Sequence, residues 1–71
     1  MAQAILRRRE VQRATGVSKS TMYRLISAGK FPKPIDLTGE GAAVGWLEAE
    51  IIDWQKRRIA ERDGASKTRR A

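Results

Sequence analysis

The sequence of 71 residues contains neither cysteine nor histidine. Without cysteine the chain has no disulfide framework and no thiolate metal site. Without histidine it lacks the commonest general base and the commonest zinc ligand. We therefore expect a protein that is not an enzyme and that uses neither a cofactor nor a metal ion.

Long apolar stretches are also missing. No run approaches the roughly 20 residues of a membrane helix, and the first residues lack the apolar segment of a signal peptide. These absences predict a soluble, cytoplasmic protein with no membrane partner. A chain of this length forms one small domain that buries only about 60% of its unfolded surface, which leaves little room for an enclosed active site.

Acidic residues are nearly absent from the first half of the chain. Residues 1–34 carry eight basic side chains and a single acid, Glu10, for a net charge of +7. Residues 35–61 carry a net charge of −3, and residues 62–71 a net charge of +3. A basic surface attracts the phosphate backbone of nucleic acids, although a solvated basic surface is the alternative explanation.

The basic half contains the pattern of a helix-turn-helix. One helix is expected over 8–15, and Gly16 follows at a position where helices commonly end in a left-handed residue. Ser18 is a good N-cap for a second helix over 19–28. In that second helix Met22, Leu25 and Ile26 recur at the spacing of a buried stripe.

The opposite side of the second helix offers groups that suit DNA. A recognition helix contacts base edges in the major groove through residues near its N-terminal half. Arg24 can make a bidentate contact to guanine or bind phosphate, but it can also be a solvated arginine. Ser20 and Thr21 can contact base or phosphate, or only support the helix cap. Tyr23 can donate to a phosphate, or lie at the edge of the core.

Other basic residues near this helix are candidates for phosphate contacts. The predicted DNA-binding set is Lys19, Ser20, Thr21, Tyr23, Arg24, Lys30, Lys33, Arg8 and Arg9. For the lysines, surface solubility is the alternative. For the arginine run at 7–9, which precedes the first helix, a solvated edge is as well supported as a backbone contact.

The remaining elements predict a wing and a third helix. Gly29 stands where the second helix would stop, and K-F-P-K-P at 30–34 cannot continue a helix because of its prolines. Residues 34–46 alternate like a hairpin around Gly39 to Gly41, with Phe31 and Trp46 as its anchors. A third helix is expected over 47–62, ended by Asp63-Gly64. Earlier in the chain, the pair Ile5-Leu6 is either a short strand or the entry to the first helix.

These elements predict a mainly α fold with a small β-hairpin, a winged helix-turn-helix of three helices plus a wing. The domain should span residues 1–63, and residues 64–71 should form a disordered basic tail. Trp46 and Trp54 are expected in the core.

Four blocks of the sequence resemble the AlpA-like phage regulatory proteins. They are I-L-R-R-R-E-V at 5–11, T-G-V-S-K-S-T-M-Y-R-L-I at 15–26, G-K-F-P-K-P at 29–34 and A-V-G-W-L-E-A-E-I at 43–51. The resemblance covers about residues 5–62. It implies a winged helix-turn-helix related to the MerR-type and phage excisionase DNA-binding domains. It also implies a recognition helix at Ser18 to Ser27, with Ser20, Thr21, Tyr23 and Arg24 facing DNA.

The wing departs from the pattern of similar proteins. Such wings often carry a basic residue near the tip, whereas this chain has Glu40 there. An acid at the tip is repelled by phosphate, so the backbone amides of Gly39 and Gly41 remain as the wing's means of approaching DNA.

The predicted function is sequence-specific binding of double-stranded DNA by a prophage or mobile-element transcriptional regulator. One alternative is an excisionase-like factor that sets the direction of recombination with an integrase. Another, from a different class, is a protein-interaction module that docks through Leu47, Ile51 and Trp54. Because a single short helix contacts few base pairs, we expect a partner such as an integrase or RNA polymerase, or self-association on repeated DNA sites.

Overall fold

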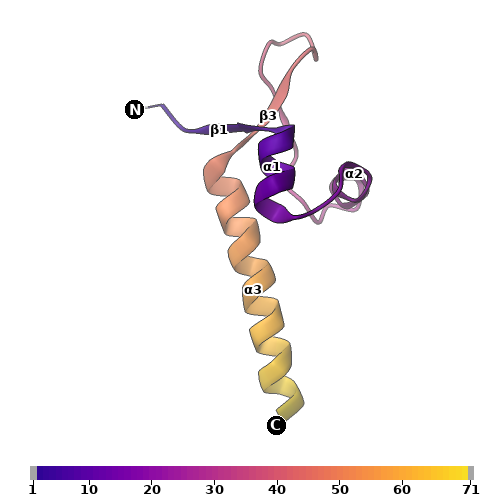
Figure 1. Cartoon of the computed structure of the whole chain (residues 1–71), viewed down its shortest axis with the longest axis vertical. Coiled ribbons are helices and arrows are strands. Elements are labelled where there is room, and N and C mark those ends of the chain that lie inside the picture. Colours follow the sequence, from indigo (N-terminus) through magenta and orange to yellow (C-terminus); the bar gives the residue numbers. More distant parts are fainter. Residues whose placement is uncertain (1, 71) are drawn as a thin grey trace.

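The computed structural model describes the backbone of residues 2–70 and the side chains of residues 2–64. In chain order the elements are strand β1 (Ile5–Arg7), helix α1 (Arg8–Thr15), helix α2 (Lys19–Ser27), strand β2 (Ile35–Asp36), strand β3 (Val44–Leu47) and helix α3 (Glu48–Arg70). Figure 1 shows the three helices on one side of the β1–β3 pair, with the loop of the hairpin projecting from the other end of the molecule. The fold is mainly α with a small hairpin, as predicted, and it is compatible with a winged helix-turn-helix.

The strands form a three-stranded antiparallel sheet in the order β1-β3-β2. Leu6 pairs with Trp46, and Ile35 pairs with Gly45. Ile5-Leu6 is therefore part of a strand, which settles the choice left open by the sequence. The hairpin is accordingly not a two-stranded wing alone, because β1 pairs with the free edge of β3.

The core takes one buried side chain from almost every part of the chain. These residues are Val11, Met22, Phe31, Trp46 and Ile51. The indole Nε1 of Trp46 donates a hydrogen bond to the Pro32 carbonyl at 2.8 Å, so this buried polar group is satisfied. Trp46 and Phe31 anchor the hairpin as predicted. Trp54 is half-buried and packs against the cluster.

The paired part of the hairpin is shorter than the sequence suggested. β2 ends at Asp36, although the Leu37 amide still donates to the Ala43 carbonyl at 2.9 Å. Beyond this point the Asp36 carboxylate accepts the loop amides that a longer ladder would have used. The connection is therefore a wide loop over 37–43.

The predicted end of the third helix at Asp63-Gly64 is wrong. α3 continues through Gly64 to Arg70, and Gly64 lacks the positive φ that ends a helix at Gly16. Glycine inside a helix costs only about 1 kcal/mol relative to alanine, so it weakens a helix without ending it. The division into a domain over 1–63 and a tail over 64–71 stays a prediction, and the side chains after residue 64, with all of Ala71, lie outside the described residues.

No helix in the described part of the chain combines the length and the apolar character needed to cross a membrane.

Candidate DNA-binding surface

The start of α2 is fixed by Ser18. The Thr21 amide donates to Ser18 Oγ at 3.3 Å, and the Ser18 hydroxyl donates to Thr21 Oγ1 at 3.0 Å. The turn before it contains Gly16, whose φ of 73° is left-handed and whose amide donates to the Gln12 carbonyl. These local signals place α2 as the sequence predicted. Thr21 is thus engaged in the cap, which was the alternative to its contacting DNA.

The two faces of α2 have different surroundings. Met22 is fully buried, and Leu25 and Ile26 pack against the core. The opposite face exposes Lys19, Ser20, Tyr23 and Arg24. Within residues 2–64, these four side chains make no hydrogen bond or ion pair with the rest of the protein. Tyr23 is 38% exposed, so part of its side chain is open to solvent.

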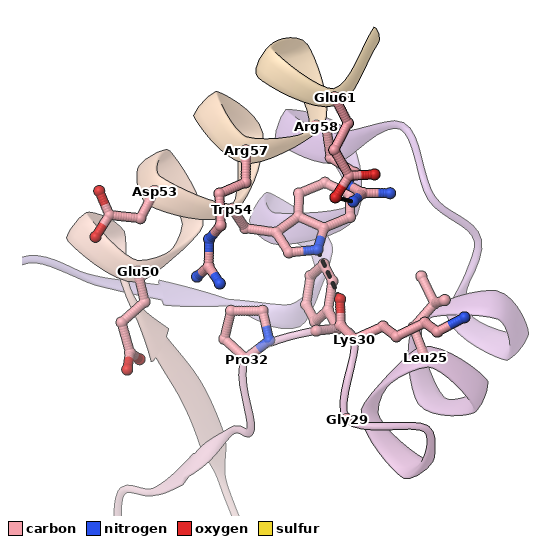
Figure 2. Close-up of a pocket in the computed structure, with 11 residues that line it drawn as sticks. Leu25, Gly29, Lys30, Pro32, Glu50, Asp53, Trp54, Arg57, Arg58 and Glu61 are labelled. Atoms are coloured by element: carbon pink, nitrogen blue, oxygen red, sulfur yellow. Dashed lines mark hydrogen bonds and ion pairs between the residues drawn. The ribbon is translucent and has the colours of Figure 1, made fainter. Parts of the chain in front are cut away.

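The loop after α2 is held against α3. Trp54 Nε1 donates to the Lys30 carbonyl at 2.8 Å, and the Phe31 and Trp54 rings pack edge to face with centroids 4.9 Å apart. Figure 2 shows the Lys30 side chain extending toward Leu25 on α2. Lys30 and Lys33 are both exposed. The clamp therefore fixes the backbone of this loop while leaving both ammonium groups free to reach a ligand.

Between this loop and α3 lies a groove of about 690 Å³, with both signs of charge along its walls (Figure 2). Lys30, Arg57 and Arg58 are balanced by Glu50, Asp53 and Glu61, and Arg58 forms an ion pair with Glu61. Such a mixed lining does not select for a phosphate group. We do not place DNA here.

The three arginines before α1 occupy different environments. Arg7 is attached to the sheet, because its Nε donates to the Val44 carbonyl at 3.1 Å. Arg8 is half-buried, and its Nε is enclosed without a hydrogen-bond partner among the described residues. Arg9 is exposed. At the N-terminus of α1, the Glu10 carboxylate accepts the Arg7 amide at 2.8 Å, so the protein's own acid already occupies part of that site.

The wing is the one part of the predicted surface that the structure corrects. The Asp36 carboxylate accepts the amides of Gly41 at 2.9 Å, Gly39 at 3.1 Å and Thr38 at 3.2 Å. These bonds, led by that from Gly41, hold the pKa of the Asp36 carboxyl below its ordinary value of 3.8. The amides of Gly39 and Gly41 are therefore not free to approach phosphate. With Glu40 exposed at the tip, the wing presents acid to any DNA.

Sequence reasoning missed the role of Asp36 in the wing. It predicted Asp36 in a strand, where the structure also has it, but not that its carboxylate accepts the amides of residues 38, 39 and 41. The available signal was an aspartate directly before a turn, because aspartate side chains commonly cap turns.

Comparison with known proteins places this arrangement in a family. Residues 4–59 match the family model described as "Prophage CP4-57 regulatory protein (AlpA)". The chain belongs to the AlpA family of phage regulatory proteins. The match spans β1, α1, α2, the wing and the first half of α3.

One relative of this AlpA family member is an uncharacterized protein, ORF88, of Enterobacteria phage P4. The two are 44% identical over 57 residues, which is 80% of this chain. The aligned part covers 62% of the relative, so the chain spans less than two thirds of that protein's length.

Proposed function

We propose that this AlpA family member is a regulator that binds double-stranded DNA by inserting α2 into the major groove. The observation that carries the proposal is the exposed face of α2, where Lys19, Ser20, Tyr23 and Arg24 have no partner within the described residues. The other face of the helix is fixed in the core by Met22. Such a helix presents its polar side chains on a rigid support, which is what recognition of base edges requires.

The surroundings of each side chain suggest different roles. Ser20 lies in the first turn of α2 and Arg24 in its last turn, and both side chains are exposed and suit base contacts. Lys19, Lys30, Lys33 and Arg9 are exposed and suit phosphate, which fixes register and supplies much of the affinity. Tyr23 suits a phosphate contact through its hydroxyl. Thr21, inside the cap, and Arg8, half-buried, have the least freedom in the set.

The acidic wing leaves most of the binding to α2 and its flanking lysines. α2 has nine residues, which is enough to contact only a few base pairs. Useful specificity then needs copies on repeated sites or a partner such as an integrase or RNA polymerase. We expect the protein to act in the cytoplasm, where the DNA lies.

The test is the change of Arg24 to alanine, measured with duplexes selected from a random pool by the wild-type protein. Loss of a bidentate base contact should weaken binding by about 1–3 kcal/mol and relax the preference at one position of the site. Arg57→Ala on α3 is the matched control, because it removes the same charge from an exposed position outside this surface. Equal effects of the two changes, or wild-type affinity that does not fall steeply with salt, would show the proposal to be wrong.

A further inference from the structure

The sheet has a second face that the helices do not cover. On β1 and β3 the side chains of Leu6, Val44 and Trp46 pack in or against the core. Because side chains alternate along a strand, the intervening residues point the other way. This outer sheet face comprises Ile5, Ile35, Leu37, Gly45 and Leu47, with the charged Arg7 opposite Gly45 at its β1 edge.

Gly45 makes this face continuous. A Cβ atom placed on Gly45 would lie 2.6 Å from Cγ2 of Ile5 and 3.2 Å from Cδ1 of Leu37. These two side chains come from opposite edges of the sheet, so both reach over the glycine on the central strand. Ile5, Ile35 and Leu37 remain 38%, 37% and 40% exposed. Contiguous apolar side chains on a small soluble protein commonly mark an interaction site.

The two edges of the outer sheet face differ in charge. The β1 edge carries Arg7 and is followed by Arg9, whereas the β2 edge continues into the wing with Asp36 and Glu40. A second copy turned over about an axis parallel to the strands would set its β1 edge against the β2 edge of the first. Opposite charges would then meet at both margins of an apolar centre. The face is thus complementary to itself.

We infer that the outer sheet face binds a second copy of this chain when both copies occupy neighbouring DNA sites, an inference that rests on the proposed function. Four partly exposed side chains fall well short of the about 800 Å² that each partner gives to a stable interface. The contact is therefore too small to hold a dimer in dilute solution. Two copies on adjacent sites have a much higher effective concentration, and a weak contact suffices there.

The experiment compares a duplex carrying one selected site with duplexes carrying two, with the spacing varied over one helical turn of about 10 base pairs. The wild-type protein should bind the second site with an affinity about 5- to 150-fold higher than the first, the range typical of coupled sites. The double change Ile35→Thr and Leu37→Thr should bring this factor close to one. Threonine suits a strand, and single-site affinity should stay within about twofold because no DNA-facing residue changes.

The control is the double change Ile52→Thr and Ile59→Thr. These isoleucines are 41% and 50% exposed on α3. The control therefore also replaces two exposed apolar side chains by threonine, but at positions outside the outer sheet face. The coupling factor should not change. Circular dichroism and a thermal melt of both variants establish that they are folded. Glu40→Gln, which removes one marginal charge, should lower the coupling factor without weakening single-site binding.

The outcomes separate the two proposals. If the wild-type protein does not bind the single-site duplex in a salt-dependent way, the proposed function is wrong and this inference falls with it. If single-site binding holds but the wild-type factor is one, only the inference on the outer sheet face is overturned. It is also overturned if the Ile35/Leu37 variant keeps the wild-type factor, since the face would then serve another occupant or none.

Discussion

At the scale of single residues, Gly45 has the strongest steric requirement among the glycines of residues 2–64. The position of its missing Cβ is 3.1 Å from the Leu6 carbonyl oxygen and still closer to Ile5. The neighbour on one side is backbone in a paired strand, which cannot move without disturbing the β1–β3 ladder. Only glycine fits at the centre of this sheet.

Gly45→Ala should therefore lower the free energy of unfolding by about 1–3 kcal/mol, the usual cost of forcing an extra methyl into a packed site. Chemical denaturation followed by tryptophan fluorescence measures this directly. Gly64→Ala is the control, because a Cβ there meets nothing within 4 Å and alanine favours helix. A Gly45 variant as stable as wild type would mean that the sheet is looser than described.

Asp36 is the residue whose charge shapes the wing. Its pKa is lowered in the folded protein, chiefly by the Gly41 amide. A lowered folded pKa means that the carboxylate contributes stability above its ordinary pKa of 3.8, and that this contribution is lost as the pH falls through the lower folded value. The wing loop should thus be ordered at neutral pH and released in acid.

We expect the Gly41 amide resonance to titrate with a midpoint below pH 3.8. In Asp36→Asn the same amide should show no such titration, because no carboxylate remains to accept it. The Gly16 amide, which donates to a carbonyl far from any acid of the wing, is the internal reference. A midpoint at or above pH 3.8 would contradict the hydrogen bonds from the wing amides to the Asp36 carboxylate.

At the scale of elements, α2 depends on the cap that begins it. Ser18→Ala removes the oxygen that accepts the Thr21 amide and should cost about 1 kcal/mol of stability, as loss of an N-cap typically does. Ser27 is exposed at the other end of α2. Ser27→Ala should keep the free energy of unfolding within about a few tenths of a kcal/mol of the wild-type value. Thermal unfolding of the pair measures the difference. Equal stabilities would show that the helix is held by its packing alone.

The predictable elements are those with local signals. α1 and α2 are delimited by Gly16, Ser18 and Gly29, which lie close to the ends that they define. β1 had no local signal of comparable strength, because its partner β3 is far along the chain and pairing depends on tertiary contact. Gly64 gave a misleading signal, since glycine weakens a helix but ends it only when the backbone takes positive φ.

The candidate site was predictable to a similar degree and for the same reason. Helical spacing is enough to separate Met22, which is buried, from Tyr23 and Arg24, which are exposed. Ile51, one residue of the docking stripe in the interaction-module alternative, is 1% exposed and lies in the core, so it is not available for docking. The alternative itself stays a prediction. The full geometry of the wing could not be predicted, because the choice of amides that donate to the Asp36 carboxylate depends on how the loop curls around it.

At the scale of the whole molecule, charge is divided along the fold. The segment with net charge +7 contains β1, α1, α2 and the two lysines after it, whereas residues 35–61, with the wing and most of α3, are net negative. A uniformly basic protein would bind DNA through any face. Here the larger positive charge lies on the segment that holds α2, apart from the smaller charge of +3 on residues 62–71. Basic residues of equal charge should therefore differ in their effect on binding.

Lys33→Ala and Lys56→Ala test that division, since both remove one exposed ammonium group. If Lys33 neutralises a phosphate, its loss should weaken binding alike on selected and random duplexes and reduce the slope of log affinity against log salt by about 1. Lys56 lies on α3, outside the predicted DNA-binding set, and its loss should leave that slope unchanged. Isothermal titration calorimetry or fluorescence-anisotropy titrations at several salt concentrations give the slope of log affinity against log salt for both variants. Two equal reductions would mean that DNA responds to net charge alone, and the assignment of the binding surface to α2 and its flanking loop would not stand.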